Sequence, residues 1–314
     1  MDNFLVAVEA VLPLFSFILI GLIVKKCNIL SYEDTKKINS FVFSVFLSIS
    51  LFYSVYSADL DRDFRPKLLI FTVVMILILW STTAIIVCKF VKENQVRGAM
   101  IQAINRSNFI IMGIPLMANI FGPENVGVAA MLVSVVVPLY NISAVIVLES
   151  FRGSDNKFSL GTILRGIVHN PLLRGAALGA VLLLLRIKFP SPIEKPLADI
   201  ARATSPLALI ILGASFKPVE SLEGYKRLGI CILGRLVLIP GIAVTLAWFL
   251  GFRGMELVGI IGVFGTPTAI SSYAMAQKLD SDAELTSNCI VFSTGLACIT
   301  LFLWILFFKN LGAF

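Results

Sequence analysis

Two short stretches of the sequence place polar residues beside helix-breaking prolines in apolar surroundings. The first, residues 105–121 (NRSNFIIMGIPLMANIF), has Asn108 seven residues before Pro115, and the second, far downstream, is Gly265-Thr266-Pro267-Thr268. Proline lacks an N–H and disfavours helical geometry in the residue before it, so we expect helix breaks at Gly113-Ile114-Pro115 and Gly265-Thr266-Pro267. Paired breaks in two halves of a membrane protein point to a transporter binding site. The alternative is that each proline only kinks its helix.

The residues at these breaks could recognise an anion without a buried charge. The side-chain amide of Asn108 offers both donors and an acceptor. A half-helix that starts after a break presents free N–H groups and a positive dipole end, which suit a carboxylate. The alternative is that such polar side chains only join neighbouring helices. We expect the substrate-binding residues to be Asn108, Gly113, Pro115, Asn141, Arg235, Thr266, Pro267 and Thr268.

Charged residues inside apolar stretches are costly and therefore informative. Arg106 and Arg235 could each attract an anion, or each could snorkel its long side chain to water. Arg174 and Arg202 lie nearer to the ends of apolar stretches, where snorkelling is favoured. The two acidic residues in such stretches, Glu9 and Glu149, also lie near ends, which argues against a central carboxylate that binds protons or sodium.

The composition is that of a polytopic membrane protein. Of 314 residues, 58% are hydrophobic and 14% are charged, whereas soluble domains carry about 25% charged residues. No catalytic motif is present, the single His169 and five dispersed cysteines suggest no metal site, and we expect neither an enzyme nor a cofactor. A span needs about 20 apolar residues. The ten expected spans are 4–24, 37–57, 66–90, 97–120, 125–149, 162–185, 196–216, 227–250, 256–277 and 285–308.

The charge distribution sets the expected orientation. Lys and Arg are more frequent in the loops after the odd-numbered spans than in the opposite loops. Those loops should be cytoplasmic, so both termini should lie outside the cytoplasm and the net charge of +7 should not indicate nucleic-acid binding. The chain divides into a first five-helix half (1–150), a cytoplasmic link (151–161) and a second half (162–314). Five is odd, so the second half should be inverted relative to the first, with one break in the fourth span of each half.

Several motifs, in order, resemble the auxin efflux carrier family, which is related in fold to the bile acid–sodium symporters and includes the plant auxin exporters. They are N-x-x-x-M-G-I-P at 108–115, Tyr140-Asn141, Asn170-Pro171, Ser205-Pro206-Leu207-Ala208-Leu209, Arg235 with Pro240, and Pro267. The resemblance implies an all-α fold of ten transmembrane helices, built as two inverted five-helix repeats with crossed, broken helices four and nine. It also implies a scaffold part and a mobile part, often in a homodimer. Ser48, where the family usually has proline, and Arg106 depart from the family pattern.

The sequence therefore predicts a secondary transporter of a small organic anion such as a carboxylate. Transport would proceed by alternating access at a midplane site between the broken helices. The expected partners are this anion, the lipid bilayer of a cell (inner) membrane and a second copy of the chain, and not a nucleic acid. The alternative from another class is a membrane ligand sensor with a transporter-like fold. A channel ranks third, because the sequence lacks the repeated acidic or carbonyl-rich signals of a filter.

Overall fold

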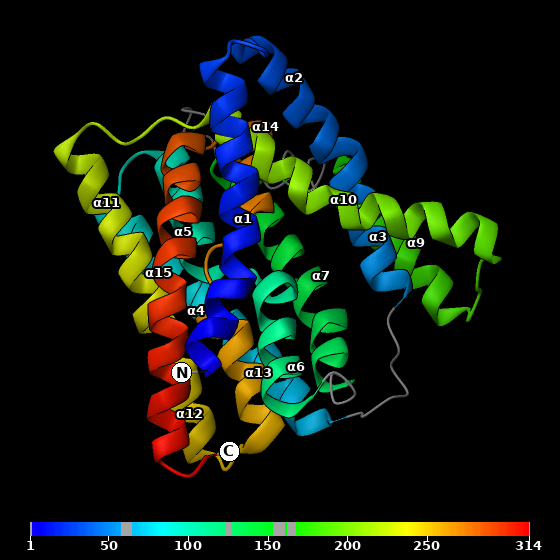
Figure 1. Ribbon diagram of the computed structural model, residues 1–314, viewed down its shortest axis with the longest axis vertical. Coiled ribbons are helices and arrows are strands. Elements are labelled where there is room, and N and C mark those ends of the chain that lie inside the picture. Colours follow the sequence, from blue (N-terminus) through cyan, green and yellow to red (C-terminus); the bar gives the residue numbers. More distant parts are fainter. Residues whose placement is uncertain (1, 58–64, 123–126, 153–160, 162–167, 314) are drawn as a thin grey trace.

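The computed structural model describes residues 2–57, 65–122, 127–152, 161 and 168–313 (Figure 1). All the regular elements in these ranges are helices. They are α1 (Asp2–Lys26), α2 (Tyr32–Phe41), η1 (Val42–Leu47), α3 (Ser48–Tyr56), α4 (Pro66–Phe90), α5 (Asn94–Asn105), η2 (Phe109–Gly113), α6 (Ile114–Phe121), α7 (Gly127–Ser150), α9 (Pro171–Leu184), α10 (Ser191–Ser215), α11 (Leu222–Leu233), η4 (Gly234–Leu238), α12 (Ile239–Phe249), α13 (Gly254–Gly265), α14 (Ser271–Lys278) and α15 (Ala283–Asn310).

The described helices confirm a polytopic membrane protein. Six of them, counting contiguous helical segments together, are long and apolar enough to cross a bilayer, and three shorter helices are also apolar. Large apolar side chains such as Ile70, Leu77 and Ile85 are exposed along α4, which suits contact with lipid. Most of the expected link at 151–161, and the start of the span expected at 162–185, lie outside the described residues.

Four helices form a panel through their contacts with one another. In this panel α1 packs along α10, α3 packs against α9, and α10 also contacts α3 (Figure 1). Glycines let the backbones approach: a Cβ added at Gly175 would lie 2.5 Å from the Ser48 carbonyl oxygen, and one at Gly179 would lie 2.6 Å from that of Phe52. Close packing through small residues is the usual basis of helix association in membranes. We call α1, α3, α9 and α10, together with α2 and η1 that lead into α3, the panel, and α4 to α7 with α11 to α15 the core.

The helix that contains Pro115 is not broken at this proline, contrary to the expectation from the sequence. Gly113 and Ile114 both have right-handed helical backbone angles. The π-helical segment η2 precedes Pro115, and its wide turn closes with the Ile114 N–H donating to the Phe109 carbonyl, five residues back. Such a turn shifts the hydrogen-bond ladder, so the helix can absorb a residue without an N–H.

A π-helical turn occurs at two further places in the described chain. The π-helical segment η4 ends with the Ile239 N–H donating to the Gly234 carbonyl, directly before Pro240. The segment η1 ends directly before Ser48, the position where the resembling family usually has proline. The π-helical turn is therefore present before Ser48 even though this chain has no proline at that position.

The first interruption lies at Arg106–Asn108, between α5 and η2, and the second lies between α13 and α14, as the sequence predicted. Arg106 and Thr266 both have extended backbone angles. The two extended segments run antiparallel, with a bridge between Ser107 and Thr268. The Asn108 N–H donates to the Pro267 carbonyl at 2.9 Å, and the Ala269 N–H donates to the Arg106 carbonyl at 3.1 Å. Each interruption thus satisfies backbone groups of the other, as a helix break inside a bilayer requires. We call these paired segments, 106–108 and 266–269, the crossover.

Candidate functional site

A cavity of about 510 Å³ lies between the panel and the crossover. The panel contributes α1, α3 and α10, including Tyr53, Thr204 and Ser205. The core contributes the crossover, the start of η2, the start of α14 and α7. The cavity therefore lies where segments far apart in the sequence meet.

Two half-helices begin at this cavity. Phe109, Ile110 and Ile111, the first residues of the continuous helix formed by η2 and α6, line it, and so do Ile270 and Ser271 at the start of α14. The N-terminus of a helix carries unpaired N–H groups and a partial positive charge. Both starts thus direct the end that attracts anions toward the same space.

Asn108 lies directly before η2 and lines the cavity. The residue is only 7% exposed. Its backbone is fully engaged, because its N–H donates to Pro267 and its carbonyl accepts from Met112 at 3.2 Å. Among the described residues, however, its side-chain nitrogen Nδ2 has no hydrogen-bond partner. A buried donor without a partner is costly, so Asn108 is suited to donate to a ligand in the cavity.

Arg106 also lines the cavity, although the sequence suggested no definite role for it. It is 3% exposed, which excludes the snorkelling interpretation. Its guanidinium donates to Asn141 Oδ1 at 2.6 Å and to Met275 Sδ at 2.6 Å. Asn141 is held in turn by donating to the Val137 carbonyl at 2.7 Å. The structure therefore brings Arg106, Asn108 and Asn141 to one cavity wall.

Arg235 is fully buried, so it does not snorkel either, but it does not line this cavity. Its guanidinium donates to five backbone carbonyls, at distances from 2.5 to 3.4 Å. Two of these carbonyls end α5, and the other three end α13 or follow it directly; they belong to Ile104, Asn105, Val263, Phe264 and Thr266. The guanidinium satisfies carbonyls that the breaks leave free and neutralises the negative ends of both helices. Arg235 thus holds the crossover together from behind the cavity.

The remaining expected site residues lie around the crossover without lining the cavity. Thr266 donates from its hydroxyl to the Gly262 carbonyl at 2.9 Å, and Thr268 donates to that of Ala103 at 2.9 Å. Pro267 accepts from Asn108, as described above. Gly113 allows a close crossing of two helices, since a Cβ added there would lie 3.3 Å from the Gly262 Cα. Pro115 lies in the first turn of α6.

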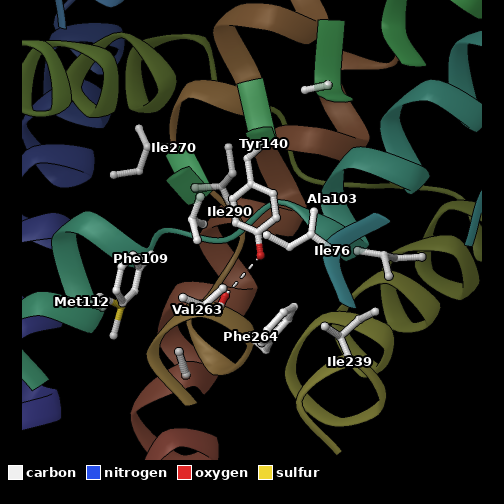
Figure 2. Close-up of a cluster of buried hydrophobic side chains, with 14 of the residues drawn as sticks. Ile76, Ala103, Phe109, Met112, Tyr140, Ile239, Val263, Phe264, Ile270 and Ile290 are labelled. Carbon is white, nitrogen blue, oxygen red and sulfur yellow. Dashed lines mark hydrogen bonds between the residues drawn. The ribbon is translucent and has the colours of Figure 1, made fainter. Parts of the chain in front are cut away.

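Apolar packing supports the crossover wall. Figure 2 shows Tyr140 beside Ala103 and Ile290, with its hydroxyl directed at the Val263 carbonyl, 3.4 Å away. Phe109 is 1% exposed and lies beside Met112 in the same view. Residues such as Tyr140 and Phe109 fix the positions of the polar groups on this wall.

The described residues that line the cavity include no aspartate or glutamate. They include two arginines, Arg106 and Arg202. The Arg202 side chain is 80% exposed and pairs with Asp199 at 3.3 Å, so it marks a part of the cavity that is open to solvent. The lining is therefore positive overall, because the half-helix ends and Arg106 add charge of one sign.

Comparisons with known proteins point to a family of membrane transport proteins. A family model described as "Membrane transport protein" matches residues 6–162 and 156–305. An uncharacterized transporter of Methanothermobacter thermautotrophicus is 27% identical over 310 residues, which cover 96% of this chain and 98% of the relative. An uncharacterized transporter of Methanocaldococcus jannaschii is 23% identical over 309 residues, with the same coverage of both chains.

Proposed function

Since the chain belongs to the membrane transport protein family, that of the auxin efflux carriers it resembles, we propose that it is a secondary transporter of a small organic anion such as a carboxylate. The observation that carries this proposal is the positive cavity at the crossover. Two half-helix starts, the free Asn108 amide and Arg106 meet there, with no acidic residue among the described lining residues. Such an arrangement stabilises a bound anion and disfavours a cation.

We propose that transport proceeds by alternating access between the panel and the core. The ten expected spans would form two inverted five-helix repeats, which the two interrupted helices and their antiparallel pairing support. The cavity is open beside Arg202. At the end of the molecule where α2 and α14 lie (Figure 1), Asn39 Nδ2 donates to Gln277 Oε1 at 2.6 Å and Lys278 Nζ donates to Ser40 Oγ at 2.9 Å. We call these two α2–α14 contacts the gate.

The proposed orientation places the gate at the cytoplasmic side of a cell (inner) membrane and both termini outside. The lysines that end α1 lie at the gate end of the molecule, and both termini are drawn at the other end (Figure 1). In this orientation the cavity faces outward and the gate closes it from the cytoplasm.

This orientation predicts opposite labelling of two single cysteines. Cys27, which is exposed after α1, should be protected from an impermeant thiol reagent in intact cells when the other four native cysteines are replaced. A cysteine in place of the exposed Ser191, at the start of α10, should be labelled when the five native cysteines are absent. Lysed cells provide the control, because both positions should then react. Labelling of Cys27 but not of position 191 in intact cells would reverse the orientation.

The proposed function is tested in two steps on purified protein. A thermal-shift panel of organic acids should contain at least one that raises the melting temperature, because a ligand that binds the folded state stabilises it. The stabilising acid should then cross the membrane of proteoliposomes that contain the protein and not that of empty ones. Binding without flux would favour the alternative function of a ligand sensor, and the absence of any stabilising anion would contradict the proposal.

Asn108 is expected to bind the substrate directly. Asn108→Ala should weaken ligand affinity by about 0.5–3 kcal/mol, the range for a lost neutral or charge-assisted hydrogen bond. Asn108→Asp should be worse, because it places a negative charge against the anion. Melting temperature without ligand and ligand affinity are measured on the same preparations. Unchanged affinity with a lower melting temperature in Asn108→Ala would assign Asn108 to helix packing instead.

A further inference from the structure

Arg106 and Arg235 are both buried arginines at the crossover, yet their charges are compensated very differently. Arg235 donates to five carbonyls at the negative ends of α5 and α13. Arg106 donates to one neutral amide oxygen, on Asn141, and to one thioether sulfur, on Met275. Of these two arginines, Arg106 lines the cavity and Arg235 does not. The two residues carry the same guanidinium group but differ in the hydrogen-bond acceptors that surround it.

The partners of Arg106 leave its charge without a counter-ion. In the part of the chain that the structure describes, it forms no ion pair, and its other guanidinium N–H groups donate to no protein atom. A thioether is a weak acceptor. The starts of η2 and α14, which line the same cavity, carry partial positive charge and add to the imbalance. A buried charge is normally paired and fully hydrogen-bonded, so this cation is suited to a negative group that the described residues do not supply.

We propose that the anionic group of the substrate is the counter-ion of Arg106. The guanidinium presents several N–H groups in a planar fork, which matches a carboxylate in a two-pronged contact. Asn141 keeps the guanidinium oriented, and the substrate takes the place of the Met275 sulfur. This inference rests on the proposed function and makes it more specific, because Arg106 then requires a charged group at this position in place of an uncharged polar one.

Pairs of acids and their amides test this charge requirement. The probes are acetate, propanoate, succinate and phenylacetate, each beside its amide, titrated against the purified protein. The parent protein should bind at least one acid about tenfold or more tightly than the matching amide, as hydrogen bonds to charged groups imply. Arg106→Gln should lose that preference and bind acid and amide within a factor of a few. The control is Arg174→Gln, which removes an exposed cation that does not line the cavity and should keep the preference.

The outcomes separate this inference from the proposed function. If Arg106→Gln prefers the acid as strongly as the parent protein does, the inference is wrong and the transporter proposal stands. If the parent binds none of the acids while binding amides, both are wrong. Should Arg106→Gln fail to fold, Arg106→Lys decides: it keeps the charge and loses the fork, so the preference should persist with weaker binding of the acid. Loss of the preference in a folded Arg106→Lys would overturn the inference.

Discussion

Arg235→Gln is expected to destabilise the folded protein by about 3–5 kcal/mol, the range for removing one partner from a buried charged network. The side chain is fully buried and its guanidinium donates to five carbonyls that end α5 and α13. Glutamine has one NH₂ group and no charge, so most of these carbonyls would be left without a donor. The crossover would lose its alignment, and transport should fall with it. Thermal melting and flux of the purified variant provide the measurement.

Two further variants define the role of Arg235. Arg235→Lys keeps the charge but not the planar fork, so it should reach one helix end and give intermediate stability. Arg253→Gln is the control. Arg253 donates to the carbonyls of Trp248 and Phe252, but it is exposed, so its replacement should change the melting temperature little. A folded Arg235→Gln with parental melting and lost ligand affinity would contradict the positioning role and support direct substrate binding, which the sequence had suggested.

Hydropathy correctly predicted an all-helical membrane protein, and proline chemistry correctly predicted one of the two helix interruptions. The long apolar segments identified the membrane class, and Pro267 correctly marked the second interruption, because its missing N–H fits an extended segment that needs no donor there. Pro115 misplaced the first interruption, since a π-helical turn absorbed the proline. Nothing in the local sequence distinguishes a proline that breaks a helix from one that follows a wide turn.

The candidate site could be predicted only in part, because it forms where two distant segments pair. Asn108 and Asn141 line the cavity, whereas Thr266, Pro267 and Thr268 are engaged in or beside the crossover pairing. That pairing joins positions more than 150 residues apart, so side-chain directions there do not follow from local patterns. Arg235 illustrates the difficulty. Its positive charge suggested that it binds an anion, whereas its hydrogen-bond partners are the carbonyls at two helix ends. The polar stretch around Arg106 contained a usable signal, namely a charge in the middle of an interrupted apolar helix.

Cross-linking the gate is expected to stop transport. If transport proceeds by alternating access, α14 must separate from α2 when the cavity opens to the gate end. A covalent link between positions 39 and 277, whose side chains now share a 2.6 Å hydrogen bond, should therefore abolish flux. Asn39→Cys with Gln277→Cys, in a background without the five native cysteines, can be oxidised to a disulfide or bridged by a short bifunctional thiol reagent. Ligand binding from the open side of the cavity should persist, because the gate residues do not line it.

A link within the core is the matched control. Arg152 and Asp280 are also paired at 3.1 Å between segments distant in the sequence, but both belong to the core, so cysteines at these positions should bridge without loss of flux. Reduction of the disulfide at the gate should restore transport, which excludes damage by the substitutions themselves. Undiminished flux through a fully bridged gate variant would show that α2 and α14 stay together throughout transport. The proposed movement of the panel against the core would then be wrong at this contact. The reason is that α14 is continuous with the crossover segment that carries Thr268 and Ala269, so α14 should move with the crossover.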